Sequence, residues 1–128
     1  MGIDIERVAD KNKNVLASQM LNSELKLIKQ VSFSTISGLT LLWTIKESLS
    51  KVLKTGLTTP LTIYSVSQIK RVNNSFISQF VNFPQYKVIS WILDQYVVSI
   101  CLPKNTSIDL NLSSLDLKPI ISSPFPSV

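Results

Sequence analysis

The chain has 128 residues, of which 45% are apolar and 16% are charged, and its formal net charge is +5. This composition argues against disorder and indicates one globular domain with a thin charged coat, so we expect some apolar surface to meet a partner. With no His, one Cys and three Gly, the chain alone cannot form a Ser-His-Asp triad, a His- or Cys-rich zinc site or a glycine-rich nucleotide loop.

The first predicted element is a short strand at residues 2–6, GIDIE. Ile3 and Ile5 alternate with Asp4 and Glu6, so the strand has one apolar face and one face that carries two carboxylates. The pattern also places an acidic pair where a signal peptide would have basic residues. We therefore expect a folded strand at the N-terminus rather than a targeting segment.

Helices are predicted next. The stretch 11–29 contains two helix-like pieces, and Asn22 or Ser23 is a candidate N-cap for the second. From residue 37 to residue 55 the apolar residues recur at helical spacing, which predicts one long helix. Gly56 follows the last turn and is the expected left-handed C-terminal cap.

Four β-rich segments follow a turn at residues 58–60. They read LTIYSV, SFISQFV, YKVISWIL and YVVSICL, and turn-like NN, NFPQ and LDQ separate them. We predict an antiparallel β meander after the helices, which makes the fold α+β. The closing residues 113–128 are rich in Ser and Pro and predict a surface tail, so residues 1–112 form the domain.

The distribution of charge and apolar residues limits the possible partners. Lys70 and Arg71 are the only adjacent basic pair in the sequence, so we expect no nucleic-acid binding, and an acidic ligand or protein partner fits better. The longest apolar run, residues 88–102, is interrupted by polar residues, and a span needs about 20 apolar ones, so we expect no membrane span. Cys101 is interpreted as a small buried hydrophobe in a reducing compartment, which favours a cytoplasmic protein.

Two clusters carry candidate chemistry. Asp4 and Glu6 lie at i and i+2 of a strand and point to the same side, where their charges repel unless a cation sits between them. Trp43, Glu47 and Lys51 share one face of the long helix, so Glu47 could turn a third carboxylate toward the strand while Lys51 reaches beyond it. A hard divalent ion, with Mg²⁺ the natural candidate, and a phosphate would satisfy this arrangement.

Each residue also has a plainer interpretation. Glu47 and Lys51 are in the favourable order for an i, i+4 surface ion pair, worth about 0.2–0.5 kcal/mol on any helix. Asp4 and Glu6 could form the solvated side of an edge strand. A lone Trp on a helix, as Trp43 is, belongs more often to a core than to a ligand site.

GIDIE, followed some 40 residues later by WTIKESLSK, resembles two motifs of the larger, surfactin-type 4′-phosphopantetheinyl transferases. Those motifs are G-(I/V)-D-(I/L)-E on a strand and W-(S/T)-x-K-E-(S/A)-x-x-K on a helix, and both are matched without a gap. LNSEL, with Glu24, is similar to a family segment between them. KVLKTGLTTPL resembles the family's K-x-x-G-x-G-L, except that Lys54 stands where the first Gly is usual. The resemblance covers roughly residues 2–105 and implies a 4′-phosphopantetheinyl transferase-like half-domain.

Carried over to these positions, the resemblance implies a Mg²⁺ ion held on the pyrophosphate of coenzyme A by Asp4, Glu6 and Glu47. Lys51 would contact the phosphate that is attacked and neutralise charge that develops during transfer. These implied roles require the strand and the helix to lie side by side.

The resemblance also implies a base for a serine of an acyl or peptidyl carrier protein, whose hydroxyl attacks the β-phosphate and releases 3′,5′-ADP. Glu24, or Glu47 acting through a water, would be this base. Lys46 would position coenzyme A or the motif itself, whereas Trp43 is expected to pack the helix rather than touch substrate. The carrier's acidic recognition helix would suit a basic surface.

The length of the chain leaves its assembly open. The surfactin-type enzymes are pseudo-dimers whose first half lies across the active cleft, whereas the short holo-acyl-carrier-protein synthases trimerise. We therefore expect a short enzyme that self-associates, a part of a longer one, or a half-domain that pairs with another chain. The competing hypothesis is a catalytically incomplete module that binds a carrier protein or supports assembly.

Overall fold

The computed structural model describes residues 1–31, 34–54 and 61–107. It contains three α-helices and one five-stranded antiparallel sheet within these ranges, which confirms the predicted α+β class. In chain order the elements are β1 (Gly2–Arg7), η1 (Asp10–Asn12), α1 (Lys13–Ser18), α2 (Asn22–Val31), α3 (Thr35–Leu53), η2 (Leu61–Tyr64), β2 (Val66–Val72), β3 (Ser75–Phe80), β4 (Tyr86–Leu93) and β5 (Tyr96–Pro103).

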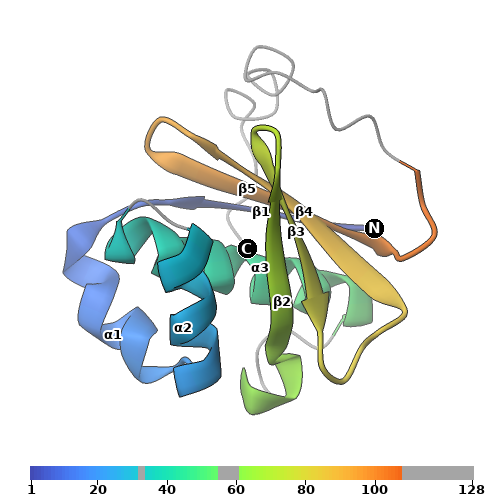
Figure 1. Cartoon of the computed structure of the whole chain (residues 1–128), viewed down its shortest axis with the longest axis horizontal. Coiled ribbons are helices and arrows are strands. Elements are labelled where there is room, and N and C mark those ends of the chain that lie inside the picture. Colours follow the sequence, from blue (N-terminus) through green and yellow to red (C-terminus); the bar gives the residue numbers. More distant parts are fainter. Residues whose placement is uncertain (32–33, 55–60, 108–128) are drawn as a thin grey trace.

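The predicted meander is formed by β2 to β5, and β1 joins it at the far edge beside β5 (Figure 1). The strand order is β1-β5-β4-β3-β2, and the neighbouring strands pair antiparallel. The hairpins after β2, β3 and β4 fall at the predicted NN, NFPQ and LDQ turns. In the register of β1 with β5, Asp4 lies opposite Ser99.

One predicted strand is wrong. LTIYSV contains η2, a 3-10 helix, and the strand begins only at Val66 and runs through VSQIKRV. The amide and the hydroxyl of Ser65 both donate to the carbonyl of Thr62, which closes a tight local turn where a strand would leave these groups to a neighbour. Tyr64 is buried there and stacks on Phe83, with 6.1 Å between the ring centroids.

Helix α3 is the central element, as predicted, but its end differs from the prediction. Ser34 caps its start by accepting a hydrogen bond from the amide of Ser37 at 3.2 Å. The left-handed cap is Lys54, with φ 57° and ψ 30°, whose amide donates to the carbonyl of Ser50. The prediction of Gly56 as the cap is therefore wrong, because the helix ends at Leu53. Gly56 itself lies outside the described residues.

The helices gather on one face of the sheet (Figure 1). Helix α3 lies against β1, β4 and β5, while α2 packs on α3 and β2, and α1 packs on α3. Between Leu39 and Ser50 every α3 residue is buried except Trp43 and Glu47. A chain of hydroxyl groups joins α3 to the sheet, because Ser90 bonds Ser99 at 2.7 Å and Ser99 donates to Thr44 at 3.0 Å. These small side chains let the helix lie close to the strands.

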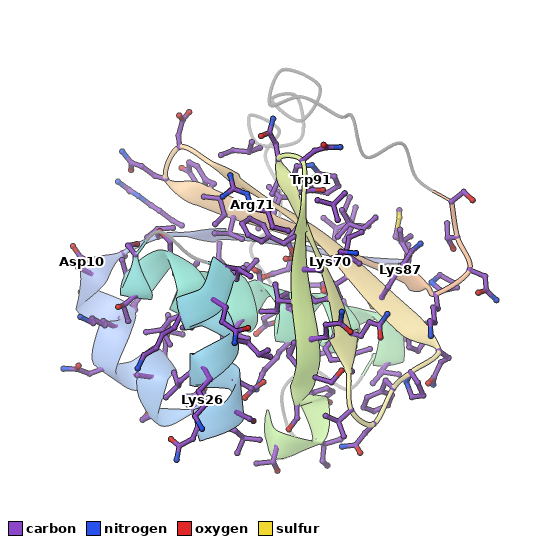
Figure 2. The ribbon with its side chains drawn as sticks, in the orientation of Figure 1. Asp10, Lys26, Lys70, Arg71, Lys87 and Trp91 are labelled. Carbon is purple, nitrogen blue, oxygen red and sulfur yellow. The ribbon has the colours of Figure 1, made fainter. Side chains whose placement is uncertain are left out.

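The opposite face of the sheet carries a second apolar cluster, built on Ile89, Trp91 and Leu102. Figure 2 labels Trp91 among the side chains of this region. On the helix side, Cys101 is fully buried, and burial raises the pKa of its thiol to about 12, so the prediction of a small buried residue is confirmed.

Other sequence predictions concern the surface. Lys70 and Arg71 are consecutive on β2 (Figure 2) and therefore point to opposite sides of the sheet, with the Arg71 guanidinium 6.0 Å from the Phe76 ring centroid. The exposed large apolar residues in the described ranges come from separate segments of the chain: Met1, Val15, Leu21, Ile63, Val81 and Tyr96. In the described ranges, no helix is long and apolar enough to cross a membrane. The predicted turn at 58–60 and tail at 113–128 lie outside the described residues, so the domain division stays a prediction.

Candidate functional site

The site begins with a close contact at Gly2. A Cβ placed on this residue would lie 2.1 Å from the backbone oxygen of Ser48 and 2.9 Å from Cγ2 of Val52, both on α3. Any side chain at this position would therefore push β1 away from the helix. Since residues i and i+2 of a strand face the same side, the contact turns Asp4, two residues later, toward α3.

Asp4 forms an ion pair with Lys51 across this interface. Lys51 Nζ lies 3.0 Å from Asp4 Oδ1 and 2.9 Å from the carbonyl oxygen of Ile3. The Asp4 side chain is 4% exposed and that of Lys51 is 31% exposed, so a buried carboxylate meets an ammonium at the edge of solvent. The pair joins residues 47 positions apart in the sequence.

This geometry settles two of the plainer interpretations. Lys51 pairs with Asp4 and not with Glu47, so the i, i+4 surface ion pair does not form. Asp4 lies on an edge strand, but it faces the helix and is buried, so its carboxylate is not on the solvated side. Trp43 is partly buried against the main core, as expected for a residue that packs the helix.

Two further carboxylates interact with Asp4. Burial raises the pKa of Glu6 to about 7, and the charges of Asp4 and Glu47 add to the effect. Burial, followed by the charge of Asp4, also raises the pKa of Glu47. Burial raises the pKa of Asp4 itself, although its hydrogen bond to Lys51 acts in the opposite direction. The predicted trio therefore shares one electrostatic environment, in which three carboxyl groups lie near one ammonium.

Asp4 has one carboxylate oxygen that a cation could neutralise. Asp4 Oδ2 is buried and finds no hydrogen-bond partner among the described residues, and a buried unpaired carboxylate oxygen is costly. Carboxylate oxygens are the ligands that Mg²⁺ prefers. Within the described ranges no group of three acidic, His or Cys side chains could hold a metal ion as it stands, so Asp4, Glu6 and Glu47 form an open cluster and not a closed metal site.

Glu24 and Lys46, also predicted as site residues, lie elsewhere and bind each other. Lys46 Nζ is 2.9 Å from Glu24 Oε1, and the side chains are 1% and 0% exposed. Glu24 Oε1 also accepts from the amide of Leu21, and Oε2 accepts from the amide of Val66, each at 3.0 Å. The pair thus connects α2, α3 and the start of β2 in the interior, apart from the carboxylates around Asp4.

Three supports of the site could not be predicted from the sequence. Gly2 was counted as part of a motif, but its contact with Ser48 depends on how closely two distant elements pack. Ile3 was assigned to the apolar face, yet its backbone carbonyl is an acceptor for Lys51. Ser99 lies opposite Asp4 in the register, which only the pairing of β1 with β5 reveals.

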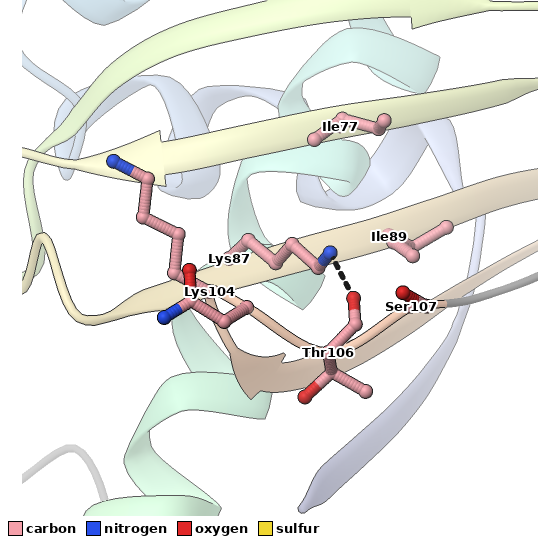
Figure 3. A pocket seen from close by; sticks show the side chains of 7 residues that line it. Ile77, Lys87, Ile89, Lys104, Thr106 and Ser107 are labelled. Atoms are coloured by element: carbon pink, nitrogen blue, oxygen red, sulfur yellow. Dashed lines mark hydrogen bonds between the residues drawn. The ribbon is translucent and has the colours of Figure 1, made fainter.

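A separate cavity of about 310 Å³ lies on the other face of the sheet (Figure 3). Ile77, Lys87 and Ile89 line it from the strands, together with residues 104–107. The ammonium of Lys87 donates to the carbonyl of Thr106 there, which the dashed line in Figure 3 marks. No predicted site residue lines this cavity, so we place the candidate site at the interface of β1 and α3.

Comparison with known proteins identifies the family of the chain. The family model described as the 4′-phosphopantetheinyl transferase superfamily matches residues 1–101. A search of curated proteins found no match. The matched segment includes the strand and the helix that carry Asp4, Glu6, Glu47 and Lys51. Because the match extends over most of the chain, we conclude that the chain belongs to the 4′-phosphopantetheinyl transferase superfamily.

Proposed function

We propose that this protein transfers 4′-phosphopantetheine from coenzyme A to a serine of an acyl or peptidyl carrier protein in a Mg²⁺-dependent reaction. The observation that carries the proposal is the open cluster of Asp4, Glu6 and Glu47 around the ammonium of Lys51, with Asp4 Oδ2 left unpartnered by the described residues. Family membership supports phosphopantetheine transfer in general.

Asp4, Glu6 and Glu47 would hold the Mg²⁺ ion, which when bound would offset negative charge on the pyrophosphate of coenzyme A. Lys51 supplies the positive charge of the chain itself. Its side chain is partly exposed, so it can reach a phosphate at the mouth of the site and stabilise the charge that develops during transfer.

We assign the base to Glu47 rather than to Glu24. Glu47 is partly exposed, and burial raises its pKa, which makes its carboxylate a better proton acceptor. Glu24 is withdrawn from solvent and already accepts three hydrogen bonds, so a carrier serine has no access to it. In the proposed step Glu47 takes the serine proton through a water, the serine oxygen bonds to the β-phosphorus, and 3′,5′-ADP leaves with the electrons of the broken P–O bond.

Lys46, for which the sequence suggested contact with coenzyme A or support of the motif, is proposed in the supporting role. Its side chain is 1% exposed and its ammonium binds Glu24, so it holds α3 in place instead of meeting a ligand. The net charge of +5 would favour encounter with an acidic carrier. We propose the cytoplasm as the compartment, and self-association or pairing with another chain as the way in which the cleft is completed.

The test is to incubate the chain with coenzyme A, Mg²⁺ and an apo acyl carrier protein and to measure the intact mass of the carrier. We expect a gain equal to one phosphopantetheine group, which Glu47→Gln and EDTA both abolish. Asp10→Asn is the matched control, because it also removes one carboxylate but from an exposed residue of η1. Equal activity of the Glu47→Gln and wild-type proteins would contradict the proposed site.

An unmodified carrier would need a second measurement. Coenzyme A with Mg²⁺ should raise the melting temperature if the folded chain binds it. A rise without transfer would indicate a half-site that requires a partner, or the alternative of a carrier-binding module without chemistry. No rise and no transfer would rule out the coenzyme A site in the chain on its own.

A further inference from the structure

Lys51 occupies an unusual position for a residue that is proposed to contact substrate. Both acceptors of its ammonium, Asp4 Oδ1 at 3.0 Å and the Ile3 carbonyl at 2.9 Å, belong to β1. The ammonium is thus directed into the protein, against a carboxylate that is only 4% exposed. While the ammonium holds Asp4, its hydrogen bonds are directed to β1 and not to a phosphate.

The pairing satisfies Asp4 only in part. Lys51 bonds Oδ1, while Oδ2 is buried and has no hydrogen-bond partner in the part of the chain that the structure describes. Glu6 and Glu47 add two more carboxylates within electrostatic range of Asp4.

We propose that the Lys51 ammonium is a built-in counter-ion of the metal site, which a divalent cation displaces from Asp4, so that cation binding releases Lys51 toward the substrate phosphate. The inference rests on the metal site of the proposed function, and it adds the regulation of that site. It assigns to Lys51 two positions, one on Asp4 and one at the substrate.

The placement of Lys51 suits such a movement. It lies in the last turn of α3, its side chain is 31% exposed, and a flexible four-carbon stem carries its charge. Lys46, one and a half turns earlier on the same helix, differs because its side chain is 1% exposed and its partner Glu24 is fully buried. Only Lys51 can leave its carboxylate by turning into solvent.

An order of binding follows. Without a divalent cation, Lys51 neutralises Asp4 and has no free charge for a phosphate. Once a cation takes Asp4, like-charge repulsion moves the ammonium outward, where it adds to the positive potential that receives the pyrophosphate. Coenzyme A alone should therefore bind weakly, and the cation should bind first.

The test measures binding of Mn²⁺ alone, from the electron paramagnetic resonance signal of the free ion, for wild type, Lys51→Met and Lys54→Met. Both variants remove one positive charge near the end of α3, but only Lys51 contacts Asp4. If Lys51 competes with the cation, Lys51→Met should bind Mn²⁺ at least about tenfold more tightly than wild type. Lys54→Met should change the affinity by no more than about threefold, since its charge acts through solvent.

A second measurement uses the wild-type protein and so does not depend on the folding of a variant. The ¹H–¹⁵N signals of the lysine ammonium groups are followed during a Mg²⁺ titration. The Lys51 signal should shift or vanish as the ammonium leaves Asp4, whereas the Lys46 signal should stay constant as an internal reference.

The outcomes separate the inference from the proposed function. Mn²⁺ binding in which Lys51→Met resembles Lys54→Met, or a Lys51 signal that ignores saturating Mg²⁺, would overturn the displacement and leave the transferase proposal intact. Tighter binding by Lys51→Met would support the displacement even if the chain transferred nothing to a carrier. No Mn²⁺ binding by any of the three proteins would overturn both the displacement and the proposed metal site.

Discussion

Glu24, a candidate catalytic residue from the sequence, has a structural role. It accepts hydrogen bonds from Lys46 and from the amides of Leu21 and Val66, and it is fully buried. The bond to Leu21 satisfies an amide at the start of α2, and the bond to Val66 fixes the start of β2. A single side chain thus connects α2 and the start of β2 to the middle of α3.

Removal of one member of this pair should destabilise the protein strongly. We expect Glu24→Ala to lower the free energy of unfolding by about 3–5 kcal/mol, because it leaves the Lys46 charge buried without a partner. The double variant Glu24→Leu with Lys46→Met should recover a large part of the loss, and urea denaturation measures both. Additive losses in the double variant would contradict this coupling.

The raised pKa of Glu6 predicts a pH dependence of stability. Burial and the charges of Asp4 and Glu47 raise this pKa from 4.5 to about 7 in the folded state. The folded protein therefore holds the proton more tightly than the unfolded chain, and this contribution is present at low pH and is lost as pH rises through about 7. Without divalent cations, the melting temperature should fall between pH 5 and pH 8.

The comparison that checks it is the Glu6→Gln variant in EDTA, whose melting temperature should fall less over the same range. Addition of Mg²⁺ to the wild type at pH 8 should raise its melting temperature, because a cation replaces the lost proton as the neutralising charge. Parallel curves for Glu6→Gln and wild type would show that Glu6 does not titrate in this range.

The backbone at the end of α3 is strained at Lys54. Lys54 adopts φ 57° and ψ 30°, a conformation that costs a side-chain residue about 1 kcal/mol and costs Gly almost nothing. The same position is the one where the resemblance expects a Gly. The helix therefore ends in the left-handed cap geometry at a residue that is not Gly.

Lys54→Gly should therefore stabilise the protein by about 1 kcal/mol and raise its melting temperature by a few degrees. Lys54→Ala is the matched control, since it loses the same charge but keeps a Cβ and the strain. Thermal unfolding of the two variants side by side separates backbone strain from charge. A Gly variant no more stable than the Ala variant would mean that the left-handed cap carries no cost.

The elements that the sequence predicted well are those with a strong local signal. The apolar period of α3 and the turns at NN, NFPQ and LDQ each depend on neighbours in the chain, and the structure has them. The prediction placed this strand too early. VSQIKRV, the strand at the sheet edge, is largely polar, whereas LTIYSV has the composition of a strand but forms a local turn in which Ser65 hydrogen-bonds to Thr62. Composition could not decide between a local turn and a distant partner.

The site was predictable in its residue types and less so in its pairing. The spacing in GIDIE and WTIKESLSK indicated that Asp4, Glu6 and Glu47 would share a region, and the structure brings them within electrostatic range of one another. Asp4, the partner of Lys51, lies 47 residues away in the sequence. The ion pair forms because Gly2 has no side chain and lets β1 approach α3 closely. The distance between two elements is set by packing, so no local pattern could have shown it.

Taken as a whole, the molecule is stabilised unevenly. Helix α3 is buried along most of its length between the sheet and the other helices, whereas α1 and η1 contain no buried residue. The buried apolar residues lie mainly on α2, α3 and the strands of the sheet. The corner of the molecule formed by η1 and α1 should therefore open without unfolding the rest.

Native-state hydrogen exchange measures this difference. Amides of α3 between Leu39 and Ser50 should exchange only through global unfolding, while those of α1 should exchange at least about 100-fold faster. Glu24→Ala should accelerate exchange in α3 and α2 together, because it weakens the global structure. Equal protection of α1 and α3 would show that the chain opens as one unit.

The two tryptophans lie in different environments and should differ in fluorescence. Trp43 is partly exposed and lies one helical turn before Glu47, whereas Trp91 is 1% exposed and lies on the sheet face turned away from α3. Their fluorescence should differ in colour, with the redder emission and the greater access to soluble quenchers belonging to Trp43. Trp43 can therefore report ligand binding at the site, and Trp91, on the far face of the sheet, serves as an internal reference. Ligand binding can then be followed by fluorescence without an added label.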